Sequence, residues 1–525
     1  MTVFNAADLF EGVSDALPDR LALVCGEEHL TYGELDRRAN RLAHALLAQG
    51  VRPGQHVGMQ LYNGIEYATA ILATIKIRAV PINVNYRYVE AELAYLYDNS
   101  DIVALFYDVE FDGRVASVAP GAPGLRLLIG VGGTTSVPGA HEYEAFTAGH
   151  PDTRGFAPRS EDDFYIVYTG GTTGMPKGVL WRMKDMLFAF ANPTYPAPET
   201  PQGWVDHAAN SGTLVMMSVA PLMHGAAQLA TFIAWWMGAT MVYVRKFDAD
   251  TVWKAVEREK VNSFTVTGDA MAIPLADALE KNTYDLSHLF AFVSTGAILT
   301  GAVRDRLAAL LPNVAILDRF GSTESGSTAQ ATPGSSPEKG LHFAPDVPDI
   351  AVLDESLRQV EPGSGVLGQL ARTGYIASGY YNDPEKTAAT FPVVDGRRWL
   401  LTGDIATVEK DGTITVFGRG SQAINTGGEK VYPEEVEAVL KGHPAVFDAV
   451  VTGIPDERFG SRVAAVVQLR ETSATSVTQE ELDAHCRREL SGYKVPRTYA
   501  FVPEMRRSPA GKADYRWAKE TAQGV

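Results

Sequence analysis

Helix-like and strand-like patterns alternate along the chain, and this alternation limits the possible folds more than any other feature. Residues 57–61, 80–84 and 103–107 are apolar runs that predict buried strands, and residues 65–76 and 90–99 between them have the period of helices. Strands that alternate with helices form parallel sheets covered by helices. We therefore predict an α/β fold.

The length of the chain and a later change of pattern predict more than one domain. The 525 residues exceed what a single hydrophobic core ordinarily holds. Shorter strands and tight turns begin near residue 349 and predict a β-rich subdomain, and the turn GRGS at 418–421 suggests a boundary. We expect a large N-terminal domain over residues 1–418 and a small α+β C-terminal domain over residues 419–525, with a hinge near 419–421.

One loop carries the strongest chemical signal. Residues 168–178 have the sequence YTGGTTGMPKG and follow a strand-like apolar run. Glycines let backbone amides approach an anion, while threonine hydroxyls and the Lys177 ammonium add donors and charge. It is not a Walker loop, because Gly178 follows Lys177 and the next residues favour a strand over a helix. A glycine-rich surface turn is the alternative, but the density of Gly, Thr and Lys favours a phosphate-binding loop.

Charge and cysteine content exclude several classes of function. The chain has 46 Lys and Arg against 63 Asp and Glu, a formal net charge of −17, which disfavours nonspecific binding to nucleic acid or to anionic membranes. A polyphosphate ligand must then be held by local basic groups and Mg²⁺. Cys25 and Cys486 fall at apolar positions, so neither disulfides nor a thiolate metal site are expected. We expect no signal peptide and no membrane span, and hence a cytoplasmic protein.

Nine short motifs follow one another in a fixed order. They are the loop at 168–178, a turn around His224, STGA at 294–297, FGSTE at 320–324, GYYNDPEKT at 379–387, TGD at 402–404, GR at 418–419, GGEKVYPEEVE at 427–437 and SPAGK at 508–512. Together they resemble the acyl-adenylate-forming superfamily, which includes acyl-CoA synthetases, luciferases and peptide-synthetase adenylation domains. The resemblance covers almost the whole chain. It implies an AMP-forming acid–thiol ligase whose small C-terminal domain is mobile.

The resemblance implies a site for ATP and Mg²⁺. The glycine-rich loop would hold the β- and γ-phosphates, through Thr169, Gly170, Gly171, Thr172, Thr173, Gly174 and Lys177. Glu324 would bind Mg²⁺ with Thr172 as a second ligand, and Thr323 would contact the α-phosphate. Asp404 would accept the ribose hydroxyls beside Arg419. The remaining nucleotide contacts would come from Gly296, Ala297, Asp318, Phe320, Gly321 and Ser322.

The resemblance also implies how the two half-reactions divide between residues. Lys512 would bridge the carboxylate and the α-phosphate while the acyl-adenylate forms. The small domain would then rotate, carry Lys512 away and bring Gly427, Gly428 and Lys430 to the site, where the glycines leave room for the pantetheine arm of CoA. His224 would line and gate the acyl pocket, although an ordinary core or loop histidine is the alternative.

This sequence departs from the family pattern at two positions. Ser421 occupies the hinge position that commonly carries Asp or Lys, so a charge-based preference for one orientation of the small domain is in doubt. Gly170 stands where many relatives have Ser, which removes one hydroxyl from the phosphate loop.

The acid itself is predicted only by class. Amino-acid-activating relatives carry an Asp in the turn that residues 221–225 form here, and its absence favours an apolar carboxylic acid. The motifs resemble most the actinobacterial synthetases for steroid side-chain and terpenoid acids, with fatty acids next. The pocket wall could include Gly296, Trp235, Trp236, Met237 and Met271, each of which could equally be core. A ligase that loads a separate carrier protein and a protein that performs one half-reaction are the alternatives. A homodimer is left open.

Overall fold

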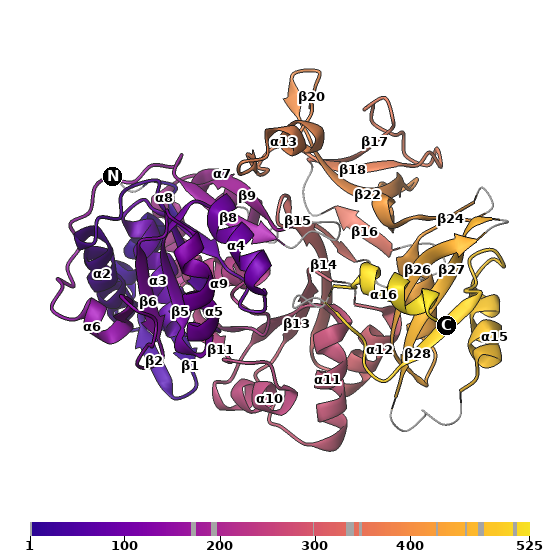
Figure 1. Ribbon diagram of the computed structural model, residues 1–525, viewed down its shortest axis with the longest axis horizontal. Coiled ribbons are helices and arrows are strands. Elements are labelled where there is room, and N and C mark those ends of the chain that lie inside the picture. Colours follow the sequence, from indigo (N-terminus) through magenta and orange to yellow (C-terminus); the bar gives the residue numbers. More distant parts are fainter. Residues whose placement is uncertain are drawn as a thin grey trace.

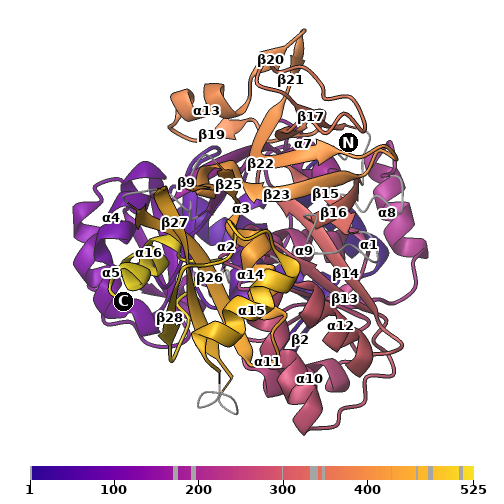
Figure 2. The ribbon, with the colours of Figure 1, turned by 90° about the vertical axis from the view of Figure 1, so that its right-hand side faces the viewer.

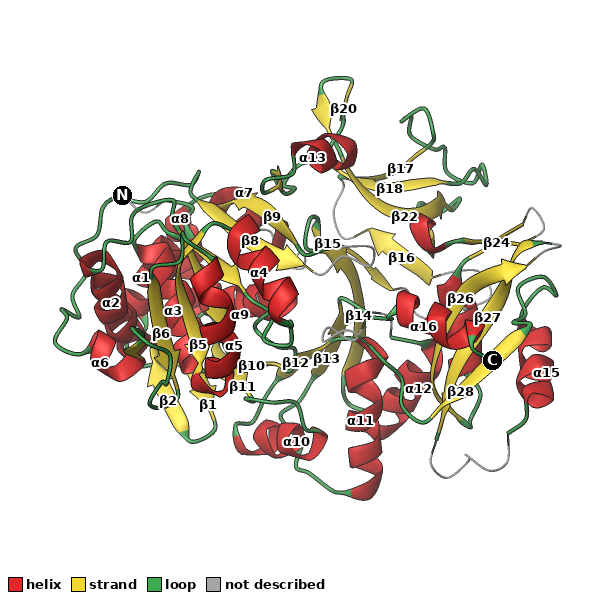
Figure 3. Ribbon diagram, in the orientation of Figure 1, coloured by secondary structure: helices red, strands yellow, loops and turns green. Residues whose placement is uncertain are grey.

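The computed structural model describes residues 3–169, 175–190, 197–297, 299–331, 341–345, 349–426, 429–456, 459–470, 477–507 and 512–525. Helices and strands alternate through the N-terminal part, orange strands extend above it, and a yellow C-terminal segment lies at the opposite end (Figure 1). Colouring by secondary structure shows helices packed around sheets at both ends (Figure 3). The predicted fold class is confirmed.

The first sheet is entirely parallel. Its five strands follow the order β4 (Val80–Asn83), β3 (His56–Gln60), β5 (Ile102–Asp108), β6 (Leu127–Val131) and β7 (His141–Glu142). Around it lie α2 (Tyr32–Ala48), α3 (Ile65–Lys76), α4 (Glu90–Asn99), α5 (Asp112–Val118) and α6 (Tyr143–Thr147). Thr31 caps α2, since its hydroxyl accepts from the Glu34 amide and the Glu34 carboxylate accepts from the Thr31 amide.

The second sheet has 13 strands among the described residues and leads to the site. Its parallel part follows the order β1 (Leu21–Cys25), β11 (Thr240–Tyr243), β10 (Val215–Ser218), β12 (Ser263–Val266), β13 (Ala291–Thr295) and β14 (Ala315–Ser322), with β2 (Glu28–Thr31) antiparallel at the edge. One face packs on α9 (Gly225–Trp236). The other packs on α10 (Ala249–Arg258), α11 (Gly268–Lys281) and α12 (Gly301–Leu310).

The β-rich subdomain continues this second sheet. Beyond β14 follow β15 (Gly326–Ala331), β16 (Leu341–Pro345), β23 (Ile414–Arg419), β22 (Leu400–Val408), β18 (Gly368–Arg372) and β17 (Ile350–Leu353), all antiparallel. Strand β14 runs well beyond its apolar residues, to Ser322, and turns back into β15. The FGSTE motif is the tip of a hairpin.

A three-stranded sheet frames the glycine-rich loop. It consists of β8 (Phe164–Thr169), β9 (Lys177–Arg182) and β19 (Gly379–Tyr380). The strand predicted after Lys177 is confirmed. The other elements of the N-terminal part are α1 (Ala6–Ala16), α7 (Met183–Phe190), α8 (Pro201–Asn210), α13 (Pro384–Thr390), β20 (Val393–Val394) and β21 (Arg397–Arg398).

The C-terminal segment has its own sheet and cores. Strands β25 (Glu429–Val431), β24 (Ile424–Thr426), β27 (Gly460–Leu469) and β26 (Val446–Asp456) are antiparallel, and β28 (Thr498–Val502) pairs with β27 in parallel. Helices α14 (Pro433–Lys441), α15 (Gln479–Glu489) and α16 (Tyr515–Gln523) pack on this sheet (Figure 2). Over the described part of the chain, no helix has the length and apolarity needed to cross a membrane.

The two cysteines are structural residues, as the sequence predicts. Cys486 is fully buried in α15, and Cys25 is half-buried at the end of β1. Burial raises the pKa of each thiol to about 11, so both are protonated at neutral pH.

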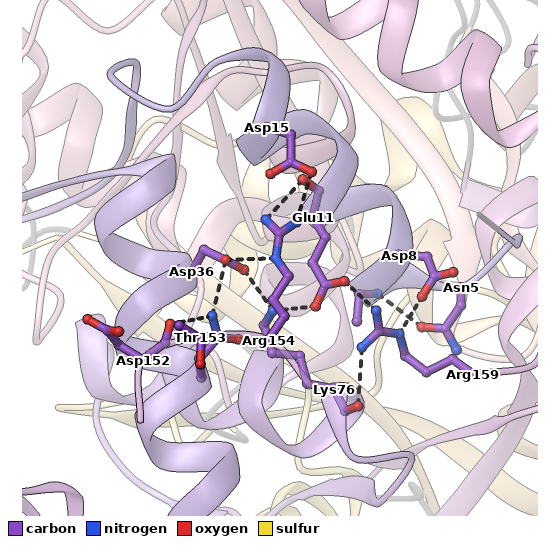
Figure 4. Close-up of polar contacts among 12 residues, drawn as sticks. Asn5, Asp8, Glu11, Asp15, Asp36, Lys76, Asp152, Thr153, Arg154 and Arg159 are labelled. Atoms are coloured by element: carbon purple, nitrogen blue, oxygen red, sulfur yellow. Dashed lines mark hydrogen bonds and ion pairs between the residues drawn. The ribbon is translucent and has the colours of Figure 1, made fainter. Parts of the chain in front are cut away.

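A buried charge network ties the N-terminal helices to the segment that enters β8 (Figure 4). Lys76, at the end of α3, is fully buried, and its Nζ donates to Glu11 (2.5 Å) and Asp36 (2.7 Å). Arg154 Nε donates to Asp36 (3.0 Å), and Arg159 donates to Glu11. Arg154 and Arg159 belong to the segment that leads into β8, so the network anchors the approach to the strand that ends at the glycine-rich loop.

Replacing Lys76 with methionine is expected to destabilise this part of the protein strongly. The change removes a fully buried cation from between Glu11 and Asp36, which keep Arg159 and Arg154 as partners, so we expect a cost of about 3 kcal/mol, the lower end of the range for a broken buried pair. Denaturant unfolding measures the loss, with the exposed Lys281→Met at the end of α11 as the control. If Lys76→Met unfolds at the wild-type denaturant concentration, the network has no stabilising role.

Candidate active site

A cavity of about 1950 Å³ lies between the N-terminal sheets and the C-terminal segment. The residues predicted for the site converge on it from distant parts of the chain. Those that line it are Thr169, Lys177, His224, Gly296, Ala297, Asp318, Phe320, Gly321, Ser322, Thr323, Glu324, Asp404 and Lys512. The motifs of the sequence therefore form one site.

Other predicted site residues are not placed or are placed in part. Gly170, Gly171, Thr172, Thr173, Gly174, Gly427 and Gly428 lie outside the described residues. Arg419 and Lys430 are described by their backbone alone. Arg419 ends β23 directly opposite Asp404 on β22, and Lys430 lies in β25. The antiparallel pairing accounts for the neighbouring positions of the TGD and GR motifs.

The tip of the β14–β15 hairpin presents Thr323 and Glu324 to the cavity. The Ser322 hydroxyl accepts from the amides of Glu324 (3.2 Å) and Ser325 (3.1 Å), which holds the turn. Trp181 Nε1 donates to the Thr323 carbonyl (2.9 Å) and ties the tip to β9. A side chain on Gly326 would meet the Ala189 carbonyl at 2.5 Å, so the close approach there requires glycine.

Tyr380 and Asp383 extend the site in a way the sequence did not predict. The Tyr380 hydroxyl donates to the Glu324 carboxylate (2.9 Å). Lys177 Nζ lies 3.4 Å from the Asp383 carboxylate and 5.8 Å from the centre of the Tyr380 ring. Both residues belong to the GYYNDPEKT motif, whose sequence alone predicts no chemical role for its members. Only their contacts with Lys177 and Glu324, which are far away in the sequence, show that Tyr380 and Asp383 belong to the site.

Two carboxyl groups, one buried and one half-buried, face the cavity from strands β22 and β14 of the 13-stranded sheet. Asp404 is 6% exposed on β22. Burial raises the pKa of Asp318 on β14 to about 7; Arg304 lowers it and Asp269 raises it further. Asp318 therefore retains a proton over part of the neutral range and can donate a hydrogen bond there.

One lobe of the cavity lies between α9 and the sheet, and we call it the acyl pocket because the resemblance described above would place the acid there. Its helix wall consists of Ala226, Leu229, Ala230, Ile233 and Met237, and its sheet wall includes Met216 and Val293. His224 is the N-cap residue of α9 at the inner end. Met237 and Gly296 thus line the wall as suggested, whereas Trp235 and Trp236 lie in the first hydrophobic core and Met271 in the second. The tryptophans face away because they lie on the core side of α9.

Buried ion pairs connect the C-terminal segment to the rim of the cavity. Lys441 Nζ on α14 lies 3.3 Å from Asp269 on α11 and 3.4 Å from Asp448 on β26. Arg507 binds the Asp448 carboxylate through two nitrogens, at 2.5 and 2.6 Å. The Asp269 carboxylate also accepts from the Thr300 amide (2.9 Å). These ion pairs connect α11 to the segment that carries Lys512. They could not be predicted from the sequence, because their members are far apart along the chain.

Comparison with known proteins agrees with the geometry. Residues 10–381 match the model of the AMP-binding enzyme family, and residues 435–512 match its C-terminal domain. A medium/long-chain-fatty-acid–CoA/3-oxocholest-4-en-26-oate–CoA ligase of Mycobacterium tuberculosis is 47% identical over 531 residues, 99% of this chain and 96% of the relative. A 3-oxocholest-4-en-26-oate–CoA ligase of Rhodococcus rhodochrous is 47% identical over 540 residues, 98% of this chain and 95% of the relative.

A solved structure has the same fold over the whole chain. The crystal structure of the anthranilate CoA ligase AuaEII in complex with anthranoyl-AMP superposes with a TM-score of 0.85 at 25% identity, and the match covers 100% of this chain and 99% of that one.

Proposed function

The chain belongs to the AMP-binding enzyme family, and from this premise we propose that it is an AMP-forming acyl-CoA ligase for bulky hydrophobic acids, with steroid side-chain acids and fatty acids as substrates. The observation that carries the proposal is that Thr323, Glu324, Asp404 and Lys512 line one cavity that continues into the acyl pocket. The names of the relatives in Mycobacterium and Rhodococcus support the class of acid.

In the first half-reaction the carboxylate of the acid attacks the α-phosphorus of ATP. An acyl–phosphate anhydride bond forms and the bond to pyrophosphate breaks. Because two anions approach each other, positive charge and hydrogen-bond donors must face them. Lys512 and Thr323 would stabilise the charge on the α-phosphate, Lys177 would hold the leaving pyrophosphate, and Asp404 would hold the ribose.

Glu324 is the described residue best suited to a magnesium ion. Carboxylate oxygen is a preferred ligand of Mg²⁺, and protein sites often supply one or two carboxylates while substrate phosphates complete the shell. The hydrogen bond from Tyr380 orients Glu324 toward the cavity. When bound, Mg²⁺ neutralises charge on the phosphates.

In the second half-reaction the CoA thiol attacks the acyl carbonyl. The thioester bond forms, the bond to AMP breaks, and the thiol proton passes to solvent. Before this step, residues 419–525 would rotate relative to residues 1–418 about a hinge near 419–421. The pantetheine arm would then contact Gly427, Gly428 and Lys430. This division into two moving domains is part of the proposal, as is a cytoplasmic location.

The proposal is tested with ATP, Mg²⁺ and a panel of steroid, terpenoid and fatty acids, with and without CoA. We expect AMP, pyrophosphate and acyl-CoA in equal amounts, measured by mass spectrometry. Pyrophosphate without thioester in the presence of CoA would contradict the ligase activity and favour loading of a separate carrier protein.

Loss of the Asp269–Lys441 pair is expected to slow the first half-reaction selectively. The pair exists in the orientation in which Lys512 lines the cavity, so Lys441→Met should reduce adenylate formation about tenfold, within the usual range of coupling energies. Conversion of supplied acyl-adenylate to thioester should change much less. Lys494→Met, which removes a pair to Glu435 inside the C-terminal segment, is the matched control. Equal loss of both half-reactions in Lys441→Met would rule out this role.

A further inference from the structure

A row of hydroxyl groups lies along the sheet wall of the acyl pocket. Ser263, Thr265 and Thr267 occupy alternate positions on β12 and just beyond it, so their side chains point to the same face of the sheet. All three line the cavity. Phe264 and Val266, between them, point to the opposite face and are buried in the core with α10, α11 and α12.

The wall around the first two hydroxyls is otherwise apolar. Ser263 lies beside Met216 on β10 and Ala291 on β13. Thr265 lies beside Val293 on β13 and Ser218 on β10, whose buried hydroxyl does not line the cavity. Other apolar residues that line this lobe are Leu214, Leu229, Ile233 and Met237. Ser263 and Thr265 therefore place two hydroxyl groups in a mostly apolar surface.

The two hydroxyls have no protein partner. Neither the Ser263 nor the Thr265 side chain forms a hydrogen bond to any part of the chain that the structure describes. Hydroxyls in protein interiors are ordinarily paired, because an unpaired one in apolar surroundings costs free energy. A ligand in the acyl pocket that offers an acceptor would remove this cost.

Strand register gives the depth of each hydroxyl in the pocket. Four residues of β13 separate Ala291, the neighbour of Ser263, from Thr295 at the carboxyl end of the strand, a distance of about 13 Å. Val293, the neighbour of Thr265, is two residues from Thr295, or about 7 Å. Thr295 pairs with Arg319 on the parallel strand β14, so Thr323 lies beyond the carboxyl end of β13, and the reacting carboxyl group belongs there. Ser263 thus faces the far end of a long acid, and Thr265 faces its middle.

We propose that Ser263 and Thr265 select acids that carry an oxygen substituent remote from the carboxyl group, and that Ser263 is the main hydrogen-bond donor. The enzyme therefore prefers keto-substituted polycyclic acids to saturated acids of equal length. The inference rests on the proposed function and refines its substrate class. A keto oxygen on the far ring accepts a hydrogen bond from Ser263, and Thr265 would serve an oxygen nearer the middle of the acid. A saturated ring leaves the hydroxyls unpaired, which a site built for hydrogen bonding penalises.

The test compares 3-oxocholest-4-en-26-oate with the same acid lacking the keto group. We expect Ser263→Ala to lower kcat/KM for the keto acid about tenfold, the effect of one lost hydrogen bond, and Thr265→Val to lower it by a smaller factor. Neither variant should lower kcat/KM for the acid without the keto group. Ser263→Thr and Thr265→Ser keep a hydroxyl and should retain the preference.

Ser218→Ala removes a buried hydroxyl on β10 that does not line the cavity, and it should leave the ratio of the two kcat/KM values unchanged. Suppose that the wild type forms both thioesters and that Ser263→Ala and Thr265→Val keep the wild-type ratio of kcat/KM values. This result overturns the inference and leaves the proposed function intact. A wild-type protein that forms no thioester from these acids or from fatty acids contradicts both.

Discussion

Replacing Lys512 with alanine is expected to lower the rate of acyl-adenylate formation by about 10²–10³-fold, the effect of removing one preorganised group that stabilises transition-state charge. Lys512, from the last part of the chain, lines the same cavity as Thr323 and Glu324 of the β14–β15 hairpin. Its ammonium would compensate the charge that develops when carboxylate and α-phosphate approach. Pyrophosphate release in single-turnover experiments measures the loss.

The same variant should retain the second half-reaction. Thioester formation from supplied acyl-adenylate and CoA does not require Lys512 at the cavity, so its rate should change little. Lys519→Ala, on the exposed side of α16, is the control for changes in the C-terminal segment. Equal loss of both half-reactions in Lys512→Ala would assign the lysine a structural role.

Replacing Glu324 with glutamine is expected to reduce adenylate formation by a similar factor, about 10²–10³-fold, because it removes the carboxylate charge that would hold Mg²⁺. The side chain keeps its size and can still accept from Tyr380, so the effect reports the charge. Tyr380→Phe removes only the orienting hydrogen bond, and we expect it to raise the Mg²⁺ concentration for half-maximal rate by about 10–100-fold.

Titration of the rate with Mg²⁺ distinguishes these effects. If Glu324→Gln and Tyr380→Phe both respond to Mg²⁺ as the wild type does, Glu324 is not a metal ligand. Trp181→Phe, which releases the Thr323 carbonyl without touching Glu324, is the control for movement of the hairpin tip.

The local parts of the fold could be predicted from the sequence because they depend on near neighbours. The capping boxes of Thr31 with Glu34 and of Thr478 with Glu481 are examples, since each needs only residues three positions apart, and both form in the structure. The end of β14 could not be predicted, because residues 319–322 have no apolar periodicity and are held in a strand by pairing with β15. That pairing is invisible in the periodicity of residues 314–317.

The candidate site likewise has residues that the sequence predicts and residues that only the structure shows. Residues inside recognisable motifs, such as Thr323, Glu324 and Asp404, were predicted and line one cavity. Tyr380 and Lys441 were missed as functional residues, because their importance lies in contacts with Glu324 and Asp269, which are remote in sequence. The hydroxyl of Ser263 was missed for a similar reason, since only the sheet register shows that it faces the acyl pocket.

The adenylate intermediate is tested most directly by following the oxygen atoms of the acid. The wild-type protein is incubated with ATP, Mg²⁺, CoA and an acid labelled with oxygen-18 in both carboxyl positions. Attack of a carboxylate oxygen on the α-phosphorus transfers that oxygen to AMP when the thiol displaces it, so AMP should carry one labelled atom and pyrophosphate none. Acyl-CoA formed together with unlabelled AMP, or with label in pyrophosphate or phosphate, would contradict activation through an acyl-adenylate.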